Sequence, residues 1–107
     1  GHTGNYDATV KAVMAVDLCL GKLVEEALNN FYKVIILADH GNADIMLDDN
    51  NEVVTTHTLS KVPFIITDKN VKLKESGDLT NVAPTILDYM DISRPLEMQD
   101  TASLLEE

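Results

Sequence analysis

The sequence predicts an α/β fold, in which helices flank a partial sheet with mainly parallel central strands. Two apolar runs, residues 33–38 and 62–67, have the length of strands and lack polar alternation, which is typical of strands buried on both faces. Two stretches with helical periodicity, residues 7–30 and 78–90, lie outside these runs. The order helix, strand, excursion, strand, helix is therefore the basis of the predicted fold class.

Length and composition limit the classes of function. The chain has 107 residues, enough for one domain, and its 45% hydrophobic and 24% charged residues are typical of a globular protein. A net charge of −10 repels phosphate backbones and anionic lipids, so we expect neither nucleic-acid nor membrane-surface binding. The longest apolar runs are too short to span a membrane.

The cysteine content and the start of the chain suggest where the protein resides. Cys19 is the single cysteine, which excludes an internal disulfide and favours a reducing compartment, and the sequence shows no signal peptide. The chain opens at Gly1 without an initiator methionine, and we therefore expect a piece of a longer protein.

The first predicted helix, residues 7–30, is amphipathic. Asp7 lies in its first turn or at its cap, where a carboxylate accepts free backbone N–H groups. Gly21 interrupts the pattern at a cost of about 1 kcal/mol relative to alanine, which points to a close packing contact. Asn29 and Asn30 are expected to end the helix.

The rest of the chain is predicted to contain smaller elements. Residues 45–54 surround a polar turn and are expected to form a hairpin. Residues 71–75 are expected to form a short edge strand. The second helix, residues 78–90, is expected to be capped by Asp78 or Thr80. The residues after this helix carry no clear pattern.

The candidate metal ligands follow a predicted buried strand. Asp39 and His40 stand directly after the first apolar run, and ligands of open α/β sheets bind at the carboxyl ends of strands. Asp and His offer one hard oxygen and one imidazole nitrogen to a divalent cation, and Gly41 permits tight backbone geometry nearby. The predicted hairpin would return His57 to the same sheet edge as His40.

Simpler interpretations of these residues remain open on sequence grounds. Asp39 is as readily a turn residue and His40 a solvated loop histidine, whereas a lone His57 is more often a surface or hydrogen-bonded histidine than a ligand. His2 lies close to the start of the chain, where residues are commonly frayed. No serine has the context of a nucleophile elbow, and no glycine-rich phosphate loop is present.

Taken together, the motifs resemble one enzyme family. In order and spacing the chain closely resembles the C-terminal end of cofactor-independent (2,3-bisphosphoglycerate-independent) phosphoglycerate mutases, which belong to the alkaline phosphatase superfamily. The motifs that carry the resemblance are Gly1-His2-Thr3-Gly4-Asn5, Lys11-Ala12-Val13, Val16-Asp17-Leu18-Cys19-Leu20-Gly21, Ala38-Asp39-His40-Gly41-Asn42-Ala43, Thr56-His57-Thr58, Val62-Pro63-Phe64-Ile65 and Val82-Ala83-Pro84-Thr85-Ile86-Leu87-Asp88.

The resemblance implies an isomerase that interconverts 3-phosphoglycerate and 2-phosphoglycerate in glycolysis and gluconeogenesis. A serine nucleophile carries the phosphoryl group in this family, supported by two divalent ions, typically manganese. By motif, His2 and His57 match ligands of one ion, and Asp39 and His40 match ligands of the other. The resemblance also implies an alkaline-phosphatase-like fold and a monomeric cytoplasmic enzyme.

Parts of the family's site have no counterpart in this sequence. The nucleophilic serine, the remaining metal ligands and the substrate-binding residues all belong to upstream sequence. We therefore expect residues 1–107 to be the C-terminal part of a metal-binding phosphatase domain, inactive by itself. The competing hypothesis is a non-catalytic acidic α/β module that binds a metal or a partner.

Overall fold

A computed structural model describes residues 4–41 and 61–106 of the chain. The chain divides into two compact units, residues 1–67 and residues 68–107, which are described separately.

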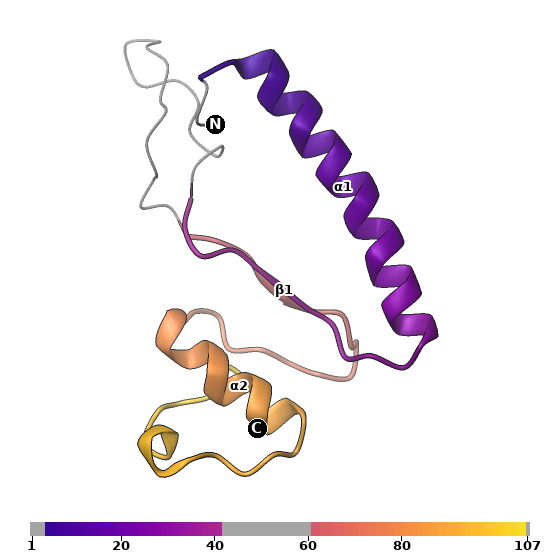
Figure 1. Ribbon diagram of the computed structural model, residues 1–107. Coiled ribbons are helices and arrows are strands. Elements are labelled where there is room, and N and C mark those ends of the chain that lie inside the picture. Colours follow the sequence, from indigo (N-terminus) through magenta and orange to yellow (C-terminus); the bar gives the residue numbers. More distant parts are fainter. Residues whose placement is uncertain (1–3, 42–60, 107) are drawn as a thin grey trace. The chain divides into compact units, whose positions relative to one another are not determined.

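The first unit begins with the long helix α1, Tyr6–Asn29 (Figure 1). Asn5 caps it, because its side-chain oxygen accepts a hydrogen bond of 2.9 Å from the backbone N–H of Ala8. Asp7 lies in the first turn, where its negative charge interacts favourably with the positive end of the helix dipole. The predicted helix is thus confirmed to within one residue at each end, with Asn5 rather than Asp7 as the cap.

The C-terminal end of α1 is closed by a Schellman motif. The N–H of Tyr32 donates to the carbonyl of Ala27 at 3.0 Å, and the N–H of Phe31 donates to that of Leu28 at 3.2 Å. Asn30 is the C-cap, as its position at the end of the predicted helix suggested. Phe31 has φ = 65°, a left-handed conformation that this motif usually assigns to glycine.

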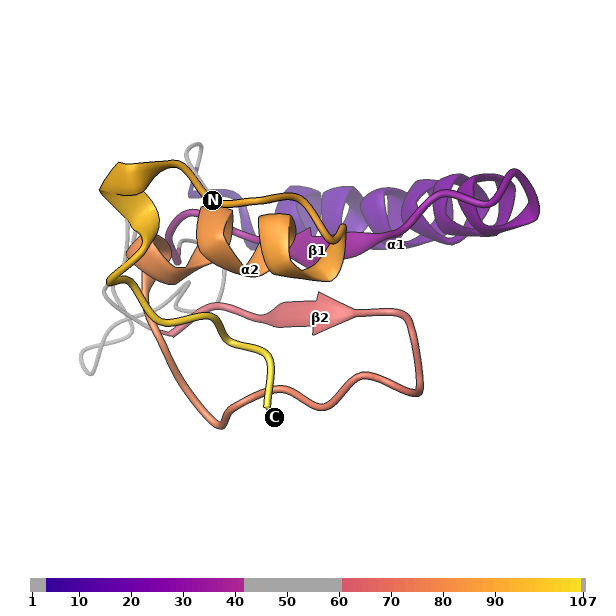
Figure 2. The same ribbon diagram turned by 90° about the horizontal axis from the view of Figure 1, so that it is seen from below.

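Two short strands form the sheet of the first unit, β1 (Ile35–Leu37) and β2 (Phe64–Ile66). They lie side by side, as expected, but run antiparallel, so the prediction of parallel central strands was wrong on direction (Figure 2). The register pairs Ile35 with Ile66, Ile36 with Ile65 and Leu37 with Phe64.

The physical reason for the wrong direction lies in the connection. A parallel pair requires a crossover, usually a helix, whereas an antiparallel pair does not. The sequence between β1 and β2 shows no helical periodicity. The absence of a predicted crossover helix therefore favours an antiparallel pair, whereas the apolar character of the strands does not distinguish the two directions.

Burial of the strands is also less complete than expected. Leu37 and Ile65 remain 40% and 47% exposed, although the apolar runs predicted burial on both faces. Within the described residues the sheet has only these two strands, so each keeps an open outer edge. An apolar run predicts that a strand is buried, but it does not identify the segment that covers it.

The second unit is built around the helix α2, Val82–Tyr89, which follows a single 3-10 turn at Leu79–Asn81 (η1). Asp78 forms a capping box with Asn81: its side chain accepts from the N–H of Thr80 at 2.9 Å, and its own N–H donates to the Asn81 side chain. Of the two predicted caps, Asp78 thus caps the 3-10 turn η1, whereas the N-cap of α2 itself is Asn81, which makes no side-chain cap hydrogen bond.

The C-terminal residues pack against α2 through specific contacts. Thr85, fully buried in α2, donates its hydroxyl to the Asn81 carbonyl at 2.6 Å and accepts the N–H of Leu104 at 2.7 Å. Two apolar side chains of this unit are buried as well, Leu104 and Pro84. The expected edge strand at 71–75 is reduced to an isolated antiparallel bridge between Leu73 and Leu105.

Arg94 fixes the loop after α2. Its Nε and one terminal nitrogen donate to the two carboxylate oxygens of Asp88, at 2.9 and 2.7 Å, and its other terminal nitrogen donates to the carbonyls of Met98 and Thr101. These hydrogen bonds hold the pKa of the Asp88 carboxyl below its usual value. The loop leads into a second 3-10 turn, Leu96–Met98 (η2), where the sequence carried no pattern.

A search of the helices in residues 4–41 and 61–106 identifies none that combines the length and the apolar character needed to cross a membrane.

Candidate metal centre

The candidate site lies just beyond the end of β1. Ala38 follows the last residue of the strand, and Asp39, His40 and Gly41 come next. The strand fixes the direction in which the chain leaves the sheet, so the two candidate ligands are held near a regular element. Asp39 is largely exposed and His40 is partly exposed, whereas Gly41 is buried.

The Asp39 and His40 side chains approach each other. The Oδ1 atom of Asp39 lies 3.5 Å from the Nε2 atom of His40. The other ring nitrogen of His40, Nδ1, lies 3.0 Å from the carbonyl oxygen of Gly41. A carbonyl oxygen only accepts hydrogen bonds, so Nδ1 must carry the proton in this contact.

This proton assignment determines what the site can hold. In the neutral imidazole Nε2 then has a lone pair, and it faces a carboxylate oxygen that also only accepts. Two acceptors at this distance are stabilised by a positive charge between them, supplied either by a second proton on the ring or by a bound cation. A backbone carbonyl that accepts from the far nitrogen is the usual arrangement around a metal-bound histidine.

The separation of the two atoms fits a shared ion. Nitrogen and oxygen ligands at about 2.1 Å from a metal, set at a tetrahedral angle, lie roughly 3.4 Å apart. The observed 3.5 Å between Oδ1 and Nε2 agrees with this distance. The separation thus suits two adjacent ligands of one divalent ion, and it equally suits a direct ion pair between the two side chains.

The pair does not complete a metal centre by itself. Across the described part of the chain, no group of three or more His, Cys, Asp or Glu side chains is placed to hold an ion. The other two predicted ligands, His2 and His57, lie outside the described residues, as do the predicted hairpin at 45–54 and its acidic turn. The structure thus brings Asp39 and His40 close together, and the assignment of His2, Asp39, His40 and His57 as metal ligands stays a prediction.

One contributor to the site is not evident from the sequence. The sequence predicts only conformational freedom at Gly41, whereas in the structure its carbonyl oxygen lies 3.0 Å from Nδ1 of His40. The position of Gly41 directly after His40 is the one sequence signal for this contact. A backbone carbonyl has no side-chain signature, so the contact is visible only in the structure.

Comparison with known proteins places the chain in a family. A family profile described as the Metalloenzyme superfamily matches residues 1–94, which is most of the chain. The donor pair beyond β1 lies inside the matched range.

Individual relatives share one name. The chain is 54% identical over 99 residues to the 2,3-bisphosphoglycerate-independent phosphoglycerate mutase of Mycoplasmoides gallisepticum, and 49% identical over 98 residues to that of Mycoplasma genitalium. It is 45% identical over 98 residues to the mutase of Staphylococcus epidermidis. Each match covers 92% of this chain but only 19–20% of the relative, so the chain spans about one fifth of their length.

The profile match over residues 1–94 and the similarity to these mutases agree with each other. The chain belongs to the Metalloenzyme superfamily.

Proposed function

We propose that residues 1–107 are the C-terminal part of the metal-binding phosphatase domain of a phosphoglycerate mutase. The whole protein would interconvert 3-phosphoglycerate and 2-phosphoglycerate by way of a phosphoserine. The observation that carries this proposal is the Asp39–His40 pair, whose spacing fits two ligands of one ion. Identity of 45–54% to mutases over nearly the whole chain supports it.

Two divalent ions, manganese in our proposal, would bind in the complete protein. Asp39 and His40 would contribute to one ion, and His2 and His57 to the other. When bound, such ions neutralise phosphate charge and lower the pKa of the attacking hydroxyl. The part of the reaction assigned to this chain is positional: the end of β1 and the Gly41 carbonyl hold the Asp39 oxygen and the His40 nitrogen in place.

The remaining properties follow from the same assignment. We propose a monomeric cytoplasmic enzyme of glycolysis and gluconeogenesis that does not bind nucleic acid. The net charge of −10 supports the last point, because it repels a phosphate backbone. The single cysteine fits a reducing compartment.

The test is a chimeric enzyme. The 107-residue chain replaces the matching fifth of the Mycoplasmoides gallisepticum mutase, and conversion of 3-phosphoglycerate is measured with manganese present. We expect the chimera to be active and Asp39→Asn to reduce its rate by about 100-fold or more, because an ion ligand and its charge are lost. The matched control is Asp100→Asn, a carboxylate exposed in the second unit, which should retain nearly full activity.

Two results would contradict the proposal. One is a folded chimera without mutase activity, since the inserted sequence would then lack what the mutase needs from this region. The other is an active chimera in which Asp39→Asn and Asp100→Asn behave alike.

A further inference from the structure

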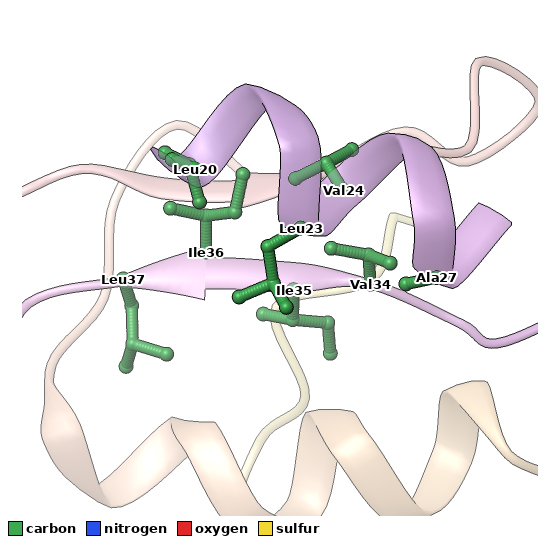
Figure 3. A pocket seen from close by; sticks show the side chains of 8 residues that line it. All are labelled: Leu20, Leu23, Val24, Ala27, Val34, Ile35, Ile36 and Leu37. Carbon is green, nitrogen blue, oxygen red and sulfur yellow. The ribbon is translucent and has the colours of Figure 1, made fainter. Parts of the chain in front are cut away.

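The two units hold their segments together by different kinds of contact. In the first unit, apolar side chains of α1 and of residues 34–37 line a shallow groove, in which Val34 and Ile36 point toward the helix (Figure 3). In the second unit, residues 102–106 are attached mainly through hydrogen bonds of their backbone. We call these five residues the strap, and they lie in the yellow part of the chain in Figure 2. A segment held in this way can leave its partners without opening an apolar core.

The strap is bound to residues 72–74 as an added strand. The N–H of Lys74 donates to the Leu104 carbonyl at 2.8 Å, and the N–H of Glu106 donates to the Lys72 carbonyl at 2.8 Å. This is the hydrogen-bond pattern of an antiparallel ladder. Both contacts join main-chain groups, so they depend on the path of the strap and not on its side chains.

A second set of contacts comes from two side chains at the start of α2. The Nδ2 group of Asn81 donates to the Ala102 carbonyl at 2.9 Å, and the Thr85 hydroxyl accepts the N–H of Leu104 at 2.7 Å. The same side chains also bind within the helix start, because Oδ1 of Asn81 accepts the N–H of Asp78 and the Thr85 hydroxyl donates to the Asn81 carbonyl. The strap and the helix start therefore share one hydrogen-bond network.

Leu104 is the buried side chain of the strap, and Gly77 makes room for it. Leu104 is 8% exposed, whereas the other strap residues are partly or largely exposed. A Cβ atom at Gly77 would overlap Cδ2 of Leu104 and would lie 2.8 Å from Oδ1 of Asn81. The φ of Gly77 is not positive, so the close contact, and not the backbone conformation, is what requires glycine here.

The chain is fixed directly before the strap. Arg94 donates to the Thr101 carbonyl and to both carboxylate oxygens of Asp88 in α2. Neither contact uses a strap residue, so both can persist when the strap leaves. The Ser103 hydroxyl adds a lesser hydrogen bond from the strap to the Asp88 carboxylate. The hinge of the strap is therefore the backbone between Thr101 and Ala102.

The different kinds of contact meet at Leu104. Its N–H donates to Thr85, its carbonyl accepts from Lys74, and its side chain lies against Gly77. A movement of this one residue breaks all three contacts together. We therefore expect the strap to be released as one piece rather than bond by bond.

We propose that residues 102–106 are a detachable strap, which docks on the second unit and leaves it as one piece, with its hinge after Thr101. Docking of Leu104 completes the hydrogen-bond network at the start of α2, and undocking leaves Asn81 and Thr85 with their partners inside the helix start alone. The proposal goes beyond the proposed function and does not depend on it, because every contact that carries it lies within residues 72–106.

The test is backbone hydrogen exchange of the 107-residue chain, followed by NMR. The amides of Lys74, Leu104 and Glu106 should have protection factors that agree within roughly threefold, because one opening exposes all three. These factors should be at least about tenfold lower than that of Met90, whose N–H donates to the Ile86 carbonyl at 3.0 Å at the end of α2. Protection factors equal to that of Met90, or spread widely among the three amides, would overturn the proposal.

Two glycine substitutions form a matched pair. Gly77→Ala should lower the protection factors of Lys74 and Glu106 by about tenfold or more and leave that of Met90 within about twofold, because the added methyl group displaces the buried leucine. Gly21→Ala adds the same group in α1, where no atom of the described residues lies within 4 Å. The close contact that the sequence suggested at Gly21 is thus not found among these residues, and this substitution should leave all three amides unchanged.

Leu104→Ala provides a second route to the same result. It removes the buried side chain but keeps the backbone, so it should lower the protection factors of Lys74 and Glu106 selectively and by a similar factor. An equal loss at Met90 in either variant would show that the strap is an inseparable part of the fold of the second unit and would overturn the proposal. Unchanged protection at Lys74 and Glu106 in either variant would show that Leu104 does not hold the strap and would contradict the proposal as well.

Discussion

The proton on Nδ1 of His40 governs the chemistry of the candidate site. The Gly41 carbonyl accepts it, so the opposite nitrogen is the one that meets the Asp39 carboxylate. A divalent ion at this pair would take the lone pair of that nitrogen together with the Asp39 carboxylate oxygen.

A fully buried hydroxyl sets the local stability of the second unit. Thr85→Val preserves the shape but leaves the Leu104 N–H without its acceptor, and we expect a loss of about 1–3 kcal/mol in the free energy of unfolding. Chemical denaturation of the 107-residue chain measures this. Thr85→Ser retains the hydroxyl and should lose clearly less. A loss in Thr85→Val no larger than that in Thr85→Ser would contradict the role of the hydroxyl.

Phe31 occupies a backbone conformation that suits glycine. The left-handed region costs a residue with a Cβ atom about 1–2 kcal/mol, and Phe31 is 97% exposed, so its side chain offers little packing in return. Phe31→Gly should therefore raise the free energy of unfolding by roughly 1 kcal/mol. The neighbouring substitution Tyr32→Gly lacks this benefit and should be neutral or destabilising. A destabilised Phe31→Gly in the chain alone would show that the aromatic ring makes a contact.

At the scale of elements, sequence reasoning succeeded where the determinants are local. The bounds of α1 were predicted to within one residue, because a capping side chain at Asn5 and an asparagine pair at the other end fix them. The adjacency of Asp39 and His40 in sequence made the candidate pair visible in the same way. The direction of β2 was not predictable from its own residues, because an apolar run is the same in either direction.

The C-terminal elements show where prediction from local sequence fails. Residues 71–75 have strand character, but the structure gives only one bridge, Leu73 to Leu105. The partner lies 32 residues along the chain in a segment without periodicity, so no local pattern reveals it. Similarly, Arg94 donates hydrogen bonds to two backbone carbonyls and to one carboxylate, and no pattern in the sequence predicts these partners.

The ion pair of Arg94 and Asp88 predicts the acid sensitivity of the second unit. The pKa of Asp88 is lowered in the folded state, chiefly by its hydrogen bonds to Arg94, so the pair stabilises the fold above the unfolded-state pKa near pH 4. This contribution is lost as the pH falls through the lower, folded value. In thermal melts from pH 6 to pH 2, the unfolding midpoint should fall less in Arg94→Gln than in the parent chain. An identical pH dependence would contradict the role of this pair.

At the scale of the whole molecule, the chain spans about one fifth of the length of the mutases it matches. In the part of the chain that the structure describes, no group of three or more His, Cys, Asp or Glu side chains is placed to hold an ion. We therefore expect the 107-residue chain alone to show no conversion of 3-phosphoglycerate above a mock preparation. Mutase activity that co-purifies with the 107-residue chain through successive chromatography steps would contradict this expectation.

The central claim is that Asp39 and His40 bind a divalent ion, and a manganese titration of the 107-residue chain followed by NMR tests it most directly. Two protein ligands leave the remaining coordination positions to water, so binding should be roughly millimolar or weaker. The account predicts that the signals of residues 39–41 broaden early in the titration and that Asp39→Asn removes this effect. Broadening confined to the acidic turn at 48–52, with residues 39–41 unchanged, would contradict it.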